Sequence, residues 1–309
     1  MSRKGIILSG GKGTRLYPAT LAMSKQLLPI YDKPMIYYPL STLMSIGVKE
    51  ILLITTPFDI DRYKFLLGNG SQWGINLSYK TQKEPNGIAE AFLIAEEFIN
   101  NSSSVLILGD NLFYGYDLSS RLKNISKNRE TSTVFAYPVN NPQDYGVVNY
   151  NEQKEIISID EKPIKPKSNF VVTGLYFYDN NVVEIAKSLK PSKRGELEIT
   201  DLNNVYLKLN KLDVFFLNEG DTWLDAGTSN TLMEASQFIK TIENRQGIKI
   251  CSPEEMALNN GWISRKQLKE LAIKLMTNEY GKYLLRLIEK WGINEFGEDF
   301  NSWSVINRK

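Results

Sequence analysis

A glycine-rich segment follows the first apolar run of the chain and is suited to binding phosphate. Residues 9–16 read SGGKGTRL, directly after the apolar run at residues 5–8. Glycines after a strand let the backbone turn tightly and bring its N–H groups close to an anion. Arg15 offers a fork of donors to phosphate oxygens, and Lys25 adds a second cation. The pattern predicts a triphosphate or pyrophosphate site, with a tight structural turn as the alternative for the loop.

The spacing of this segment does not fit two common phosphate loops. The Walker pattern needs a Lys and then a Ser or Thr after its second glycine. The dinucleotide fingerprint needs a third Gly or Ala where Leu16 stands. A dinucleotide-dependent oxidoreductase therefore does not fit the sequence.

Two carboxylates each end an apolar run. Asp110 follows the run at residues 105–108, and Asp225 follows Trp223 and Leu224. The carboxyl edge of a parallel sheet is where ligands of open α/β folds bind. Mg²⁺ takes one or two carboxylates together with substrate phosphates. We therefore expect both side chains to bind Mg²⁺, with a turn or a helix cap as the alternative for each.

Two charged segments could bind a second phosphate. Lys162 and Arg194 supply cations there, while Glu161 and Glu196 could accept hydrogen bonds from hydroxyls. The alternative is a solvated surface. Three further residues could pack on a sugar or read a base edge, with core packing as the alternative for the tyrosines: Gln82, Tyr145 and Tyr176.

The composition narrows the chemistry further. The chain has no histidine, which removes Ser-His, Cys-His and His-ligated metal mechanisms. With 37 Lys and Arg against 35 Asp and Glu, the net charge is only +2, so we expect no nucleic-acid partner. The single cysteine, Cys251, can form no internal disulfide and suggests packing in a reducing compartment. Any chemistry must therefore use carboxylates, Lys, Arg and the backbone, with or without an oxygen-loving metal.

The predicted elements alternate between strands and helices. Strands are expected at residues 5–8, 51–55, 76–79 and 105–108, with helices at 35–46 and 88–99 between them. This order predicts a Rossmann-like, doubly wound, mostly parallel sheet. A β-rich insertion is expected at residues 132–137, 146–150, 155–160 and 171–178. Further helices are expected to begin at residues 193–196 and to cover residues 232–242, 268–275 and 280–291, the last two packing on the α/β body or on a neighbouring subunit.

The length and the N-terminus suggest a cytoplasmic protein of one large or two modest domains. The chain has 309 residues, no run that approaches 18 apolar residues, and no apolar region long enough for a signal peptide. We expect an α/β core over residues 1–245, with a nucleotide part to about 130 and a sugar-binding part from about 131 to 227. A C-terminal helical region over residues 246–309 is expected to form a subunit interface.

Several segments resemble the sugar nucleotidyltransferase family. GGKGTRLYPAT at residues 10–20, with SKQLLP at 24–29, matches the signature of that family. The resemblance to its thymidylyltransferase branch extends over residues 3–291. It is carried by the strings YDKPMIYYPLSTLM (31–44), LGDNLFYG (108–115), EKPIKPKSN (161–169), VTGLYFYD (172–179), RGELEITD (194–201) and ENRQGIKICSPEE (243–255).

This resemblance implies a reaction and an assembly. The thymidylyl group of dTTP would pass to α-D-glucose 1-phosphate, giving dTDP-glucose and pyrophosphate in the first step of dTDP-rhamnose biosynthesis. Mg²⁺ would be the cofactor and a homotetramer the assembly. The alternatives are a UTP-dependent uridylyltransferase and a catalytically silent regulator that binds nucleotide sugars.

The resemblance also assigns site residues. Phosphates of the nucleotide would contact Gly10, Gly11, Gly13, Thr14, Arg15 and Lys25. The rest of the nucleotide would contact Gln26, Gln82, Gly87 and Asp110, with Gln82 and Gly87 at the thymine. Asp110 and Asp225 would bind the metal. The sugar would contact Asn111, Tyr145, Gly146, Glu161, Val172 and Tyr176, and its phosphate Lys162 and Arg194. The four catalytic cations would be Arg15, Lys25, Lys162 and Arg194.

The chain also departs from the family pattern. Tyr17 and Tyr116 stand where histidine is common. In the family's second, inhibitory nucleotide site between subunits, Ser119 and Asn259 replace a histidine and an arginine. The tail at residues 294–309 lies beyond the resemblance.

Overall fold

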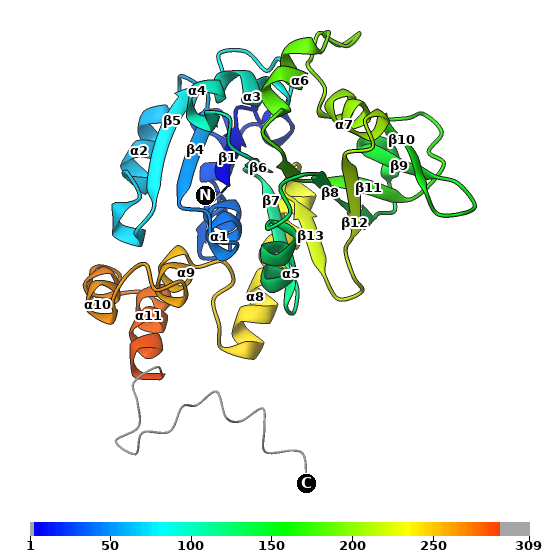
Figure 1. The fold of residues 1–309 in the computed structure, drawn as a ribbon. Coiled ribbons are helices and arrows are strands. Elements are labelled where there is room, and N and C mark those ends of the chain that lie inside the picture. Colours follow the sequence, from blue (N-terminus) through cyan, green and yellow to red (C-terminus); the bar gives the residue numbers. More distant parts are fainter. Residues whose placement is uncertain (1–2, 291–309) are drawn as a thin grey trace.

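Four parallel strands form one half of a nine-stranded sheet in the computed structural model, which describes residues 3–290 (Figure 1). Strand β1 lies between β4 and β6 and runs parallel to both, and β5 is parallel to β4 at the edge. The four strands predicted in the first 110 residues are confirmed, and so is the mostly parallel α/β fold. Their bounds are Lys4–Ser9 (β1), Glu50–Thr55 (β4), Asn76–Thr81 (β5) and Ser104–Leu108 (β6).

The other half of the sheet is largely antiparallel. Strand β11 pairs antiparallel with β6, and β8 and β9 pair antiparallel with β11. Strand β10 forms the edge beyond β9, while β12 pairs parallel with β8. The predicted β-rich insertion therefore extends the parallel sheet. The four predicted strands are Ser132–Pro138 (β8), Gly146–Tyr150 (β9), Ile156–Glu161 (β10) and Phe170–Tyr178 (β11). Strand β12 (Leu212–Phe216) was not predicted.

Alternating side chains of β1 point into two hydrophobic layers. Ile7 packs with residues of α1, whereas Ile6 packs on the opposite face with Phe92 of α3. A strand buried on both faces reads as a continuous apolar run, which is why the sequence indicated it. The helices of the Ile7 side are Tyr37–Ser45 (α1), Ile60–Leu67 (α2) and Leu118–Ile125 (α5). Those of the Phe92 side are Glu90–Ile94 (α3), Glu96–Ile99 (α4), Val182–Ser188 (α6) and Ile199–Lys208 (α7).

The single helix expected at residues 88–99 is wrong, because two short helices occupy this segment. Ala95 has φ −88° and ψ 1°, which interrupts the regular turn between α3 and α4. The apolar face predicted for the segment is nevertheless continuous. Its buried members, Ala91, Phe92, Ala95 and Ile99, all pack into the same layer.

Two small antiparallel ribbons lie outside the main sheet. Strand β7 (Asn111–Tyr114) pairs with β13 (Thr222–Asp225), and β2 (Pro29–Ile30) pairs with β3 (Lys33–Pro34). Helix α8, Ser229–Gln246, follows β13 and begins with a capping box between Thr228 and Thr231.

The C-terminal helices pack against the α/β body on the side of α1 (Figure 1). Serine side chains at Ser252 and Ser264 cap α9 and α10. The domain boundary at residue 245 stays a prediction, and Trp291 and the tail at 294–309 lie outside the described residues. No helix within residues 3–290 is long and apolar enough to cross a membrane. The C-terminal helices are Pro253–Asn259 (α9), Arg265–Lys274 (α10) and Glu279–Lys290 (α11).

A network of four charges, centred on the buried side chains of Lys33 and Glu243, joins the β2–β3 ribbon to the end of α8. The Nζ of Lys33 lies 2.9 Å from Asp32 and 2.9 Å from Glu243. Lys249 pairs with Asp32 and lies 2.7 Å from the other oxygen of Glu243. The side chains of Lys33 and Glu243 are 2% and 1% exposed, so their charges depend on each other rather than on water.

Replacing Glu243 with Gln should lower the free energy of unfolding by about 3 kcal/mol, because buried Lys33 and partly buried Lys249 would then share Asp32 alone. Urea-induced unfolding measures this change. Asp61→Asn is the matched control, since Asp61 forms an exposed ion pair with Lys64 and should change stability little. Equal effects of the two substitutions would contradict the importance of the buried network.

Candidate active site

The glycine loop leaves the carboxyl end of β1 and lies against Gln82. A Cβ on Gly10 would overlap the amide oxygen of Gln82, so the loop backbone approaches this side chain closely. Gly13 has φ 63°, in the left-handed region that favours glycine. A short 3₁₀ turn, Thr14–Leu16, follows instead of an α-helix. This segment could therefore offer an anion backbone N–H groups and Arg15, but no α-helix dipole.

Lys25 and Asp110 form an ion pair at the carboxyl edge of the parallel strands. Lys25 begins the 3₁₀ turn Lys25–Leu27, and Asp110 follows β6. Their side chains are 12% and 15% exposed. Asn111 donates from its amide nitrogen to Asp110 Oδ1 at 3.0 Å. The predicted phosphate cation and the predicted metal carboxylate thus lie side by side.

Asp225 lies at the same edge, at the end of β13. The hydroxyl of Tyr145 donates to Asp225 Oδ2 at 3.1 Å. The guanidinium of Arg15 is next to Gly227, where an added Cβ would stand 3.3 Å from Arg15 Nη2. The structure therefore brings the two predicted metal carboxylates and both nucleotide cations to one place.

The two carboxylates respond differently to this environment. Burial by itself would raise the pKa of Asp110, but the charge and hydrogen bond of Lys25 and the bond from Asn111 outweigh burial and hold that pKa below its usual value. Burial, followed by the negative charge of Asp110, raises the pKa of Asp225. A divalent cation would relieve this repulsion, because it favours the charged form of both groups.

The donor set fits Mg²⁺ when water or substrate oxygens complete the coordination. Within residues 3–290, no group of three or more acidic or thiol side chains could hold a metal ion by itself. Two carboxylates leave most positions of an octahedral ion to water and phosphate oxygens, which is the usual binding mode of Mg²⁺ in phosphoryl-transfer sites.

The predicted base-contacting residues form a hydrogen-bonded group beside the glycine loop. Gln82 donates from Nε2 to the carbonyl of Gly87 at 3.1 Å and to Glu90 Oε2 at 2.7 Å. Gly87 has φ 107° and packs on the backbone of Leu197, which leaves no space for a side chain. Gln26 is buried and accepts a hydrogen bond from the Ser24 hydroxyl at 2.5 Å.

The second predicted phosphate cluster assembles around Glu161. Arg194 Nη2 lies 3.0 Å from Glu161 Oε1, and Lys162 Nζ lies 3.9 Å from the same oxygen. The backbone N–H of Lys162 donates to the carbonyl of Tyr145 at 3.0 Å, which ties this cluster to the carboxylate pair. Gly146 lies beside Glu161 as well, since a Cβ on it would be 3.7 Å from Glu161 Oε2.

Tyr176 and Val172 lie on β11 and are 3% and 8% exposed. Tyr176 stacks on Tyr178, with the two rings 6° from parallel. Burial, followed by the charges of Glu161 and Asp110, raises the pKa of the Tyr176 hydroxyl. The core packing considered for Tyr176 is thus observed, at a position between the two carboxylate clusters.

The helix expected to open at residues 193–196 is wrong. Helix α7 begins at Ile199, and the residues before it form a loop. Gly195 has φ 79° and closes a turn by donating to the Ser192 carbonyl at 2.8 Å, so the left-handed residue prevents a helical start.

Two residues of this region were missed by the sequence analysis. Glu198 accepts from Arg194 Nε at 3.2 Å and from Nη2 at 2.8 Å, and it orients the guanidinium. Thr200 donates to Glu161 at 2.5 Å. The four-residue spacing of Arg194 and Glu198 was a visible signal of an ion pair, although it forms across a loop and not within a helix.

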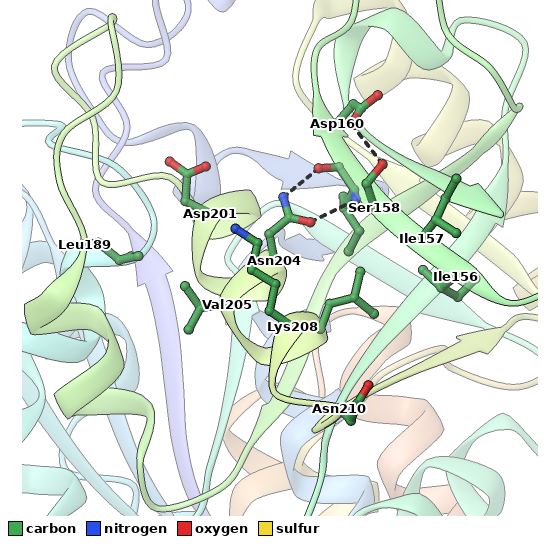
Figure 2. A pocket seen from close by; sticks show the side chains of 12 residues that line it. Ile156, Ile157, Ser158, Asp160, Leu189, Asp201, Asn204, Val205, Lys208 and Asn210 are labelled. Atoms are coloured by element: carbon green, nitrogen blue, oxygen red, sulfur yellow. Dashed lines mark hydrogen bonds between the residues drawn. The ribbon is translucent and has the colours of Figure 1, made fainter.

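A cavity of about 570 Å³ lies elsewhere, between β10 and α7 (Figure 2). None of the predicted site residues line it. Asp160 lines this cavity, whereas the side chain of its neighbour Glu161 pairs with Arg194. The side chain of Asn204 forms hydrogen bonds with the backbone of Ile159 at the edge of β10. Its Oδ1 accepts from the Ile159 N–H at 3.0 Å, and its Nδ2 donates to the Ile159 carbonyl at 2.7 Å.

The fold and the site define an α/β enzyme that acts on nucleotide phosphates, and comparisons with known proteins agree. The nucleotidyl transferase family model matches residues 4–242. A Neisseria meningitidis protein named glucose-1-phosphate thymidylyltransferase is 55% identical over 287 residues, which cover 93% of this chain and 100% of that protein. A Mycobacterium tuberculosis protein of the same name is 52% identical, with 93% and 99% covered.

Solved structures give the same result. A Bacillus anthracis structure, provisionally assigned as a glucose-1-phosphate thymidylyltransferase and holding a sucrose, has a TM-score of 0.71 and 40% identity. It is matched over 77% of this chain and 95% of that one. A UDP-glucose pyrophosphorylase with UDP-glucose has a TM-score of 0.68 and 26% identity, with 78% and 100% covered. The chain belongs to the nucleotidyl transferase family and, within it, to the glucose-1-phosphate thymidylyltransferases.

Gly10→Ala should displace the Gln82 amide and break its hydrogen bonds to Gly87 and Glu90, because the added methyl group would overlap Gln82. We expect the dissociation constant for dTTP to rise about tenfold, as for the loss of a hydrogen-bonding group. Calorimetry measures the affinity, and the side-chain amide signals of Gln82 in NMR spectra report its position. Gly11→Ala is the positional control, since no atom lies within 4 Å of its Cβ, and those signals should stay unchanged. Unchanged signals in Gly10→Ala would contradict the packing argument.

Proposed function

We propose that this chain joins dTTP and α-D-glucose 1-phosphate to give dTDP-glucose and pyrophosphate. The observation that carries the proposal is the convergence of Lys25 and Arg15 on the carboxylate pair Asp110 and Asp225, beside the glycine loop. The names of the close relatives support this pair of substrates. The product would enter dTDP-rhamnose biosynthesis.

The reaction is an in-line displacement at phosphorus. A phosphate oxygen of glucose 1-phosphate forms a bond to the α-phosphorus of dTTP. The bond from that phosphorus to the bridging oxygen breaks, and pyrophosphate leaves with the electron pair. The nucleophile is already anionic, so the absence of histidine from the sequence is no obstacle.

Catalysis then consists of alignment and charge neutralisation. Arg15 and Lys25 would hold the dTTP phosphates, and Lys162 and Arg194 would hold the sugar phosphate. Glu198 keeps Arg194 oriented before substrate arrives. Asp110 and Asp225 would hold Mg²⁺, which supplies positive charge at the phosphates when it is bound.

The rest of the pocket would provide recognition. Gln82 and the backbone of Gly87 would read the thymine, with Glu90 fixing the orientation of the Gln82 amide. Glu161 and Gly146 would contact the sugar, beside Tyr176. We also propose a homotetramer, in line with the family resemblance.

Asp110→Asn and Asp225→Asn should each lower turnover about a hundredfold or more, equivalent to about 3 kcal/mol of transition-state stabilisation, because each carboxylate places the metal. Steady-state kinetics at saturating substrates and Mg²⁺ measures this loss. Near wild-type turnover in both variants would remove the carboxylates from the site.

Lys162→Ala should raise the KM for glucose 1-phosphate about tenfold and leave the KM for dTTP nearly unchanged, since a charged hydrogen bond to one substrate is lost. The two constants are obtained by varying each substrate at saturating levels of the other. Equal increases in both would contradict the assignment of Lys162 to the sugar phosphate.

Pyrophosphate release with glucose 1-phosphate and Mg²⁺ tests the whole proposal. We expect release with dTTP that a chelator abolishes. A preference for UTP at matched concentrations would instead indicate the uridylyltransferase activity, which differs by recognition of one methyl group. Binding of dTTP without release by folded protein would indicate a regulator.

A further inference from the structure

Trp223 lies in strand β13, which ends at Asp225, and contacts one neighbour of each carboxylate of the proposed metal site. Its side chain is buried, and the residue is 6% exposed. The sequence analysis gave it no role. Two of its neighbours, Asn111 and Tyr145, connect it to the two carboxylates.

The first connection goes through Asn111. Trp223 Nε1 donates to Asn111 Oδ1 at 2.6 Å, and the backbone N–H of Gly174 donates to the same oxygen at 3.0 Å. With its oxygen held by two donors, the Asn111 amide must turn its NH₂ group the other way. That group donates to Asp110 Oδ1 at 3.0 Å. The indole N–H and the backbone N–H of Gly174 together therefore decide which end of the amide faces Asp110.

The close approach of β11 supports this arrangement. A Cβ on Gly174 would overlap the side-chain amide of Asn111. The Asn111 amide is thus enclosed by backbone on one side and by the indole on the other, and the residue is only 2% exposed. Its second orientation would place the amide oxygen against the Asp110 carboxylate, where two acceptor oxygens repel each other and no hydrogen bond forms.

The second connection goes through Tyr145. The Trp223 and Tyr145 rings meet edge to face, with centroids 5.5 Å apart and planes at 68°. Tyr137 contacts the indole in the same manner at 5.9 Å. Edge-to-face contacts fix the position of a ring. The Tyr145 ring held in this way carries the hydroxyl that donates to Asp225.

We propose that Trp223 is a positioning residue for the divalent cation, orienting Asp110 through Asn111 and Asp225 through Tyr145. This inference rests on the proposed function. Groups that orient metal ligands change metal affinity or activity by about 10- to 100-fold when they are removed. The indole itself contacts neither carboxylate through a hydrogen bond within the described residues.

Trp223→Phe tests the inference, since it removes the N–H and keeps an aromatic ring. We expect the affinity for Mn²⁺ alone, followed by the electron paramagnetic resonance signal of the free ion, to fall at least about tenfold. Turnover should fall by a similar factor at limiting Mg²⁺ and recover in part as Mg²⁺ is raised. Wild-type dTDP-glucose formation, measured in parallel, reports on the proposed function independently.

Trp73→Phe is the matched control. Trp73 is also buried, donates its indole N–H to Glu254 at 3.1 Å and meets Tyr37 edge to face at 5.9 Å. Its loss should destabilise the fold to a similar degree and leave Mn²⁺ affinity at the wild-type value. If Trp223→Phe weakens Mn²⁺ binding no more than Trp73→Phe does, while the wild type remains active, the positioning role is overturned and the proposed function stands.

Tyr145→Phe carries the test if Trp223→Phe does not fold. Tyr145 is only partly buried and keeps its ring contacts in this variant, so folding should be preserved. Loss of the hydroxyl at Asp225 should also weaken Mn²⁺ binding about tenfold. Unchanged Mn²⁺ affinity in folded Tyr145→Phe overturns the inference.

Discussion

Two carboxylates of like charge, Asp110 and Asp225, are held close together in a partly buried place, and much of the surrounding structure serves this constraint. Their repulsion is visible in the raised pKa of Asp225, to which burial and the charge of Asp110 both contribute. Lys25 and Asn111 stabilise the charge of one carboxylate, and Tyr145 donates to the other. A fold that gathers such groups stores electrostatic free energy that a bound cation would release.

The β7–β13 ribbon sets where the two carboxylates lie. Strand β7 begins directly after Asp110, and in the ribbon Asp225 pairs with Asn111. Each strand residue points to the face opposite its neighbours, so a slip of one residue would turn Asp225 away from the site. The parallel sheet places the end of β6, and the ribbon register then fixes β13 relative to it. The relative position of the two carboxylates, and the metal binding proposed for them, therefore depend on the same β7–β13 pairing.

The sequence predicted the parts of this arrangement that carry local signals. Buried strands such as β1 and β6 are continuous apolar runs, and the glycines and carboxylates that follow them mark the sheet edge. These local signals failed where the backbone conformation of a single residue decided whether a helix forms. Gly195 in the left-handed region replaced an expected helical start, and Ala95 divided an expected helix.

Other features depend on contacts between distant parts of the chain. Trp223 and Asn111 are 112 residues apart, and Lys33 and Glu243 are 210 residues apart. A buried tryptophan has the same local pattern whether its N–H orients a functional amide or only fills space. Only the strand pairing reveals which of these two applies. For the same reason, the sequence could place Asn111 beside a carboxylate without showing what holds its amide.

The Lys33 network and the Asp110–Asp225 site show opposite uses of the same kinds of side chain. In the Lys33 network, two ammonium groups face two carboxylates, so the charges cancel within the protein. At the site, Lys25 pairs with Asp110 but not with Asp225, and Arg15 forms no ion pair among residues 3–290. The Lys33 network is electrically balanced and needs no further ion. It connects the β2–β3 ribbon to the end of helix α8. The site leaves negative charge on the carboxylates and a free cation beside the glycine loop, which is the balance that a metal-bound triphosphate would complete.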